Sequence, residues 1–373
     1  MEHLQELELN LHTKRGLLVV SVVAAALAAA ATGTAGSPAG RQLASFPGYA
    51  YSIGGGSGRV GWIDTAFLLH LRSLSSPKVS SLRYTRTVHE LPNYPKWQRR
   101  LVVTGSGELI WSTSNPSQTF DYLDRILFIA RGASTASTLL KISYNAGGGT
   151  EVAGMAGDAS GFAYGEATVE PTTPDQAAYR VTGGGVFSVD THGRTARIPD
   201  APAAWVFARS AGRVLDGPFA TDANESSALR PSGVVEVRNV ADGSVLQSLS
   251  VAGVRAGALS KTEVALLVGR TLRRYRVSDG SLVGSTPLPP STAPDLETDG
   301  TMVAARNPHA VLVVNLATGR LRTIAIPMPW HPTGVAVVSG SVVWSESRGK
   351  TPAYPSTKTF TTRILSTKLA GLR

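Results

Sequence analysis

The chain has 373 residues, among them 39 Gly, 22 Pro and no Cys, and its formal net charge is +10. The absence of Cys excludes disulfides, thiolate zinc sites and cysteine nucleophiles. A hydrophobic content of 42% is enough for a large core, which excludes global disorder. The length suggests about two or three domains, although all-β folds often run longer as single units.

The first segment has the pattern of an export signal. Lys14 and Arg15 precede an uncharged apolar run over residues 16–31, and small residues follow it. This order is typical of a secretory signal peptide. We therefore predict a signal peptide over residues 1–35, a linker over 36–41, and a secreted or cell-envelope protein. The alternative is an uncleaved anchor, although the apolar run is shorter than the about 20 residues that a membrane span needs.

A motif, S-G-x-[VL]-x-W-x-x-[ST], recurs after this segment. The three clearest copies occupy residues 57–65, 106–114 and 339–347. In each copy a Ser-Gly turn starts a strand, and the Trp follows the Val or Leu by two residues, on the same face. The motif makes Trp62, Trp111 and Trp344 equivalent by register. We interpret them as packing groups between neighbouring sheets; the alternative, a carbohydrate platform, would need them to face solvent.

Weaker copies extend the repeat along the chain. With them, turn anchors fall near residues 58, 107, 161, 212, 262, 300 and 340, at a mean spacing of 47 residues. A second set of hairpin glycines falls between anchors, at Gly193, Gly243, Gly280 and Gly319. This period is typical of propeller blades of four strands each. We predict an all-β fold, a seven-bladed β-propeller of four-stranded antiparallel blades, preceded by an N-terminal signal helix.

The last blade is predicted to be completed by the N-terminal strand. Strands are expected at 335–338, 342–345 and 361–365, whereas the remaining residues make a poor outer strand. A strand near 42–46 therefore pairs there and closes the ring, which removes exposed sheet edges. The prediction is a single propeller domain over residues 42–373. A pair of β-sandwiches is the competing fold, but it does not explain anchors at one period.

The hairpin pattern, as in residues 313–321, resembles the seven-bladed β-propeller superfamily of exported bacterial proteins, with WD40-like, YVTN-type and quinoprotein-like repeats. The resemblance covers about residues 42–373 and is specific to architecture. True WD40 repeats carry Gly-His and Trp-Asp pairs, which this chain lacks, and quinoprotein repeats carry a Trp after the glycine hairpin, which it also lacks. The resemblance therefore implies no bound quinone, and no cofactor is expected.

Two loops supply candidate ligand-binding residues, which are Tyr94, Trp97, Arg99, Arg100, Trp330 and His331. The first loop is Pro-rich and combines aromatic with cationic side chains, which suits stacking on a sugar and pairing with its carboxylate. The second lies at a crossing between blades, where propeller connections approach the central channel. The structural alternative for the second loop is an aromatic-proline turn plug.

Other motifs favour structural roles. The G-x-G-x-x-G match at residues 56–61 is followed by a strand rather than a helix, so we interpret it as a turn. Residues 295–300 imitate half of a calcium loop, but its twelfth position is Arg306, so no metal is expected. His70 lies inside a strand and is interpreted as structural. No G-x-S-x-G or H-E-x-x-H occurs, and no catalytic residue is identified.

These observations favour a secreted or envelope-associated binding or scaffold propeller. Its basic charge suits an anionic polysaccharide or wall polymer, and an envelope protein is the other expected partner. The alternative is a propeller hydrolase or lyase acting on an acidic polysaccharide. No run of five Lys or Arg occurs, so nucleic acid is not an expected partner. A monomer is expected, with membrane contact only through an uncleaved N-terminal segment.

Overall fold

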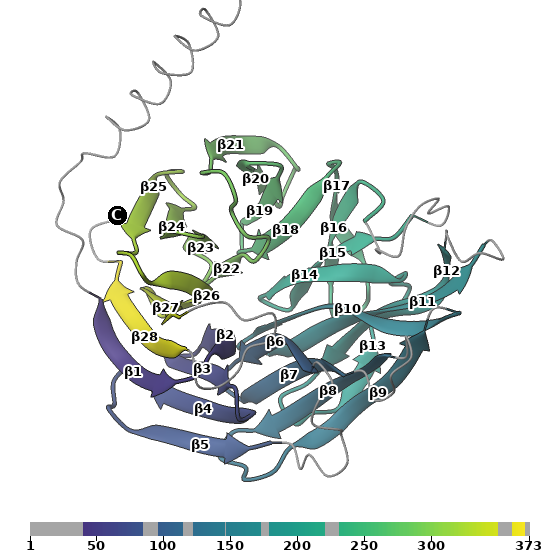
Figure 1. Cartoon of the computed structure of the whole chain (residues 1–373). Coiled ribbons are helices and arrows are strands. Elements are labelled where there is room, and N and C mark those ends of the chain that lie inside the picture. The colour runs from purple at the N-terminus through teal and green to yellow at the C-terminus, as the bar shows by residue number, and fades with distance from the viewer. Residues whose placement is uncertain are drawn as a thin grey trace, which may run out of the picture. The chain divides into compact units, whose positions relative to one another are not determined.

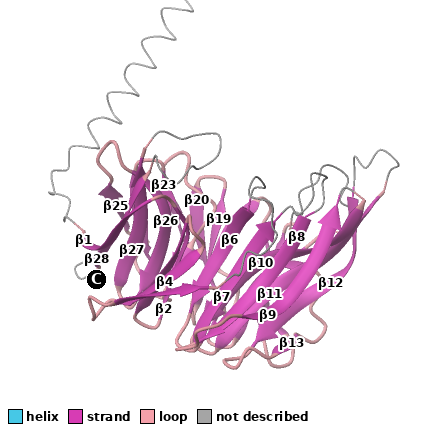
Figure 2. Cartoon of the chain, turned by 60° about the horizontal axis from the view of Figure 1, so that its bottom comes forward, coloured by secondary structure: helices cyan, strands magenta, loops and turns pink. Residues whose placement is uncertain are grey.

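Strands and turns make up all of the chain that the computed structural model describes (Figure 2), which is residues 40–84, 96–114, 122–145, 147–172, 179–220, 231–349 and 360–369. No α-helix occurs in these ranges, so the all-β prediction is confirmed. The predicted signal peptide and Tyr94 lie outside them. In this described part, no helix has the length and apolar character that crossing a membrane requires.

The strands form five four-stranded antiparallel sheets and one eight-stranded antiparallel sheet. The first four-stranded sheet contains β2 (Ala50–Gly56), β3 (Arg59–Asp64), β4 (Leu68–Ser73) and β5 (Val79–Arg83). The eight-stranded sheet contains β6 (Lys96–Val103), β7 (Gly107–Ser114), β8 (Tyr122–Ala130), β9 (Ser137–Asn145), β10 (Gly148–Asp158), β11 (Gly161–Pro171), β12 (Tyr179–Val189) and β13 (Thr195–Arg197).

The other four sheets follow the same order. They contain β14 (Ala204–Ser210), β15 (Arg213–Pro218), β16 (Val234–Asn239) and β17 (Val245–Ser250); β18 (Val254–Leu259), β19 (Glu263–Val268), β20 (Thr271–Arg276) and β21 (Leu282–Pro287); β22 (Glu297–Thr298), β23 (Met302–Asn307), β24 (Ala310–Asn315) and β25 (Leu321–Ala325); and β26 (His331–Val338), β27 (Ser341–Arg348), β28 (Thr361–Lys368) and β1 (Arg41–Pro47). Each sheet is therefore a short antiparallel meander, except where β1 joins β28.

The eight-stranded sheet consists of two successive sets of four strands. The sets β6–β9 and β10–β13 are joined by only two residue pairs, Asn145 with Gly148 and Tyr144 with Gly149. Because the joining pairs directly flank a turn, the two sets share little of their length. Repeated four-stranded antiparallel units are consistent with a propeller.

The N-terminal strand completes the last sheet. β1 pairs with β28 from Arg41 opposite Ser366 to Pro47 opposite Thr361. The strand order β1-β28-β27-β26 confirms the predicted pairing of residues 42–46. The first strand of the described chain, β1, thus covers the edge of the last strand, β28. That edge would otherwise expose unpaired backbone groups.

Five of the seven predicted turn anchors fall between the first and second strand of a set, and the other two, Gly107 and Gly161, are the first residues of the second strand. The loop pairs Ser57 and Gly58, Ala211 and Gly212, and Ser339 and Gly340 have φ of 49° and 73°, 51° and 73°, and 47° and 70°. Positive φ at both residues is the signature of a type I′ hairpin, whose twist matches that of the strands. The second set of predicted glycines, at 193, 243, 280 and 319, also has positive φ and separates third from fourth strands.

The Trp motif does not keep one register. In the β2–β3 hairpin the two loop residues are 57–58. In the β6–β7 hairpin they are 105–106, because the Thr104 amide donates to the Gly107 carbonyl. The motif is thus displaced by one residue relative to the loop. Since successive residues of a strand point to opposite faces, Trp111 faces the other side of its sheet.

All three Trp nevertheless pack between sheets. Trp62 clusters with residues of β26 and Trp344 with residues of β23 and β24, which belong to the preceding sheet in each case. Trp111 clusters with residues of β10 and β11, in the following set of strands. The predicted equivalence is wrong for Trp111, whereas the predicted packing role is confirmed. Four residues after the loop, the position of Trp62 is occupied by Ile110 in β7 and by Tyr164 in β11.

The first strand of each set lies nearest the centre (Figure 1). β2 contacts β6, which contacts β10, and the series continues through β14, β18, β22 and β26 back to β2. Glycine allows the close approach: a Cβ on Gly54 would lie 2.4 Å from the Leu101 carbonyl oxygen, and one on Gly56 2.1 Å from that of Val103. These pairs place β2 and β6 parallel. Gly56 belongs to the G-x-G-x-x-G match, so its interpretation as a hairpin is confirmed.

Candidate functional site

The predicted site residues that the structure describes lie in the first strand of a set or just before it. Arg100 belongs to β6, and Trp330 and His331 lie at the start of β26. Trp97 and Arg99 belong to β6 as backbone, and their side chains are outside the described part of the structure. The entrances of these inner strands face one end of the ring, since the inner strands run parallel. The structure therefore places the described candidates at one end, and of these Arg100 lines the two cavities described below.

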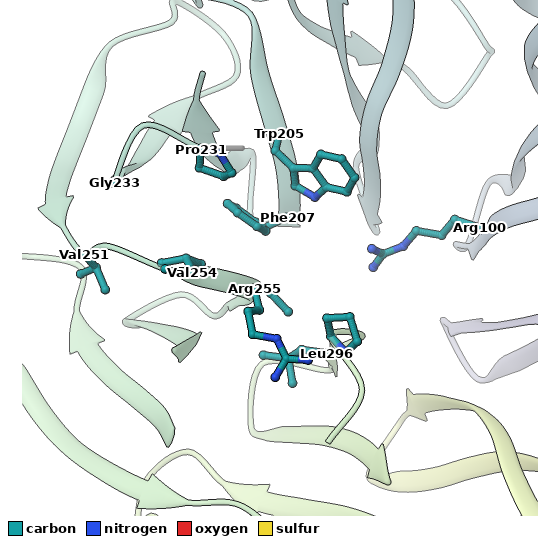
Figure 3. A pocket seen from close by; sticks show the side chains of 13 residues that line it. Arg100, Trp205, Phe207, Pro231, Gly233, Val251, Val254, Arg255 and Leu296 are labelled. Carbon is teal, nitrogen blue, oxygen red and sulfur yellow. The ribbon is translucent and has the colours of Figure 1, made fainter. Parts of the chain in front are cut away.

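A cavity of about 650 Å³, here called the mouth cavity, lies at this end (Figure 3). Its lining comes from the entrances of β6, β14 and β18 and from the segments before β16, β18 and β22. The residues are Arg100, Trp205, Phe207, Pro231, Gly233, Val251, Gly253, Val254, Arg255, Ala256, Gly257, Pro294 and Leu296. A volume of this size, with apolar walls and a few polar groups, is typical of a small-molecule or peptide site.

The mouth cavity continues toward a much smaller one of about 50 Å³, here called the central cavity. Residues from every inner strand except β26 line the central cavity. They lie further along the strands than the lining of the mouth cavity, as Val102 and Ala258 do. The space at the centre of the sheets therefore narrows from the mouth inward.

An ion pair crosses this narrow point. The Arg100 Nη2 of β6 lies 3.0 Å from the Glu297 Oε1 of β22. The two strands belong to sheets that are not neighbours around the centre. Desolvation raises the pKa of Glu297, and the guanidinium of Arg100 opposes that rise. With side chains 27% and 25% exposed, the pair is reachable from the mouth cavity.

The sequence predicted Arg100 but missed the other polar groups of the mouth cavity. Arg255 is exposed and donates to the carbonyls of Gly269 and Thr292, at 3.1 and 3.2 Å. Trp205 is half-buried, and its ring packs against the adjoining cores. Both residues lie next to the entrance of an inner strand, which is a positional signal. They form no local motif, because the groups that meet them come from other sheets.

In the second predicted cluster, around Trp330, protein side chains already cover the aromatic ring. The Arg363 guanidinium lies 4.1 Å from the Trp330 ring centroid and that of Arg348 lies 5.0 Å from it. Arg363 also forms an ion pair with Glu346, which accepts a hydrogen bond from the Trp344 indole at 2.8 Å. Such cation–π contacts stabilise the ring in place. Trp330 lines neither of the two cavities.

His331 is exposed at the edge of this cluster. Its Nδ1 lies 3.2 Å from the Pro308 carbonyl oxygen, and its ring centroid is 6.1 Å from that of His309. Among the described residues, no group of three His, Asp or Glu could hold a metal ion. The role of His331 in ligand binding stays a prediction.

The acidic stretch that imitates a calcium loop is divided among three structural contacts. Asp295 pairs with Arg306 at 3.0 Å, and Glu297 pairs with Arg100. Asp299 accepts hydrogen bonds from the Thr301 amide and, through its other oxygen, from Gly340 in the neighbouring sheet. Each carboxylate thus has its own partner.

His70 belongs to a hydrogen-bonded chain within the first sheet. Its Nδ1 lies 2.7 Å from the Ser81 hydroxyl and its Nε2 lies 2.8 Å from the Asp64 carboxylate. Asp64 also accepts from the amides of Ala66 and Leu68, which holds the turn after β3. None of these hydrogen-bonded residues lines either cavity. Both ring nitrogens are therefore satisfied, as a structural histidine requires.

Two carboxylates are buried inside the sheets themselves. Asp216 is fully buried and pairs with Arg238 at 3.1 Å; Glu108 is 1% exposed and pairs with Arg59 at 2.8 Å. Desolvation raises the pKa of each to about 7, against the lowering effect of its arginine. Neither carboxylate lines the mouth cavity, and both bear on stability.

Comparison with known proteins establishes no family for the chain. No protein-family model matches it, and no curated protein matches its sequence. Among solved structures, the computationally designed Ika8 protein covers 87% of this chain and 99% of its own, with 12% identity and a TM-score of 0.49. Sqt1 of Saccharomyces cerevisiae covers 88% of this chain and 99% of its own, with 12% identity and a TM-score of 0.45.

A chain of the mitotic checkpoint complex covers 88% of this chain and 92% of its own, with 8% identity and a TM-score of 0.48. At TM-scores below 0.5 these likenesses add nothing to the architecture that the sheets themselves define. The observed pairing therefore stands alone: an all-β fold of repeated four-stranded antiparallel units, consistent with a propeller.

Proposed function

We propose that the chain is an exported, seven-bladed β-propeller that binds a protein partner at its mouth cavity. Counting the two sets of the eight-stranded sheet separately, together with the five other sheets, leads to seven blades. The proposed export rests on the signal-peptide pattern of residues 1–35. The observation that carries the binding role is a cavity of about 650 Å³ with apolar walls and two arginines, assembled from several blades.

Binding is favoured over catalysis by the state of the nearby acids. General acid–base chemistry needs a carboxylate or imidazole free to exchange a proton with substrate. Asp295 and Glu297, next to the cavities, are each paired with an arginine. The hydrolase or lyase alternative has no comparable support among the described residues.

A second candidate partner is an anionic polysaccharide or wall polymer. The net charge of +10 and the guanidinium groups at the mouth favour polyanions. A Trp ring beside them could stack on a sugar, as Trp205 is placed to do. Sugar hydroxyls, however, also need acceptor side chains, and none of the described residues that line the mouth cavity supplies one.

The test compares a double arginine variant with a single-arginine control for binding to envelope protein from the cells that make the chain. We expect the double variant Arg100→Met and Arg255→Met to lose at least tenfold in binding, because two cations leave the site. Arg276→Met is the matched control, since this exposed residue pairs with Asp279 in a turn away from the cavity. Equal binding by the double variant would refute a role for the mouth cavity.

A protease arm separates the two partner classes. Treating the envelope fraction with protease before the assay should abolish binding to a protein partner. Binding that survives this treatment and weakens with salt would instead identify the anionic polymer.

A further inference from the structure

Among the described residues, the polar side chains that line the mouth cavity are all hydrogen-bond donors. Arg100 and Arg255 present guanidinium groups and Trp205 an indole N–H, and the other lining residues are apolar or glycine. Guanidinium and indole groups donate and do not accept. A ligand that satisfies this lining must therefore supply acceptors, and a negatively charged oxygen group satisfies it best.

The two cations at the mouth differ in their charge balance. Arg255 donates only to the backbone carbonyls of Gly269 and Thr292, and it has no carboxylate partner among the described residues. Arg100 is already paired with Glu297, although its Nε is buried without an acceptor. The mouth therefore holds one uncompensated cation and, deeper inside, a second that is neutralised by a carboxylate.

The walls between these cations are apolar. Phe207 and Leu296 are buried, and Trp205 and Val254 are half-buried with faces toward the cavity (Figure 3). Removing apolar ligand surface from water against such walls contributes about 25 cal/mol per Å². The ligand should therefore join an apolar body to one anionic group.

The depth of the site favours a chain end. The space narrows from about 650 Å³ to about 50 Å³, and the ion pair between Arg100 and Glu297 spans the narrow part. A polymer that continued in both directions would need a second opening of comparable size to leave the mouth cavity. A terminus can instead enter and stop at the arginines.

We propose that the mouth cavity captures the C-terminal end of a polypeptide whose last residues are apolar. The α-carboxylate would pair with Arg255 and approach Arg100, while the last side chains contact Trp205, Phe207 and Leu296. Capture of a terminal carboxylate by fixed donors is an established mode of peptide recognition. This inference rests on the proposed function, because it identifies the part of a protein partner that enters the site.

Glu297 sets the affinity in this arrangement. It occupies the guanidinium that an incoming carboxylate would approach, and its own charge repels that carboxylate. Replacing it by Gln keeps the shape of the side chain and removes the charge. Binding of an anionic chain end should therefore improve in Glu297→Gln and decline in Arg255→Met.

The test uses acetylated hexapeptides with four randomised residues followed by two Leu, made both with a free C-terminus and as C-terminal amides. Retention by the full chain is measured by equilibrium dialysis with mass spectrometry. We expect at least tenfold more retention of the free acids than of the amides. Arg255→Met should lower retention about tenfold, Glu297→Gln should raise it severalfold, and Arg276→Met should leave it unchanged.

Equal retention of acids and amides would overturn the proposal, as would equal retention of amides that carry Asp among their randomised residues. Decanoate competing as well as the free-acid peptides would show that an acyl chain is the ligand, which also overturns it. If no peptide is retained while the double arginine variant still loses its envelope partner, this inference fails and the proposed function stands.

Discussion

Two regions of the molecule combine Trp, Arg and Glu at the same end of the sheets, and they use these residues differently. At Trp330, Arg363 covers the indole ring and also pairs with the buried Glu346. At Trp205, by contrast, the ring borders a cavity of about 650 Å³. The first cluster satisfies its own charges and aromatic surface.

The difference shows that residue type alone does not make a binding site. A cation over an aromatic ring is an internal contact when both belong to one well-packed sheet, as at Trp330. Trp and Arg side chains become available to a ligand when they come from different sheets and line a cavity, as at Trp205. The three predictions below test this contrast between an internal cluster and an open one.

The largest expected effect is on stability in the internal cluster. Arg363→Ala would leave Glu346, which is 1% exposed, buried without its cation, and such a loss costs about 3–5 kcal/mol. Arg100→Ala removes a partner from Glu297, which is 25% exposed, so its cost should be about 1 kcal/mol. Urea unfolding of both variants measures the difference. Similar costs for the two would break the contrast.

A smaller effect concerns pH, and it sharpens the distinction between buried and open carboxylates. Burial raises the pKa of Glu108 and Asp216 to about 7, above their unfolded values. Between about pH 4.5 and 7 the unfolded chain releases these protons while the folded chain keeps them. The free energy of unfolding should therefore fall as pH rises through this window.

Urea titrations at pH 5 and pH 8 measure this slope. Glu108→Gln should flatten it, because the amide does not titrate. Glu170→Gln, at an exposed ion pair with Arg180, is the matched control and should leave the slope unchanged. A free energy of unfolding that rises over the window would contradict the prediction.

The smallest effect separates binding from folding. Trp205→Ala should weaken binding of the partner about tenfold, since aromatic groups in desolvated pockets dominate binding energies. Trp330→Ala should leave that binding unchanged and lower the free energy of unfolding instead, because its ring packs on the core and under two arginines. Binding isotherms and urea unfolding of the two variants provide the measurement. The reverse pattern would locate the site at Trp330.

The sequence predicted the architecture well because each repeat carries local signals. Turn glycines such as Gly58 and Gly340 need positive φ, and that need appears in the chain as a recurring motif. The pairing of β1 with β28 was predictable because the last set lacked an outer strand. The register of Trp111 was not, since the loop at 105–106 shifted by one residue under an unchanged motif.

The candidate site was predictable only in part. Arg100 was identified from its basic, aromatic loop, whereas Arg255 and Trp205 carry no motif. Glu297 lies 197 positions from Arg100 in the sequence, so no spacing connects them.

By itself, the sequence determined the repeat, the all-β class and the pairing of β1 with β28. Hairpin turns and alternating side chains are properties of a few neighbouring residues, so a local pattern can encode them. Tertiary structure alone decided which polar groups meet at the mouth and which are neutralised. Those meetings depend on how the entrances of β6, β14, β18 and β22 converge at the centre. A local pattern cannot encode that convergence, because each strand contributes only a few residues to it.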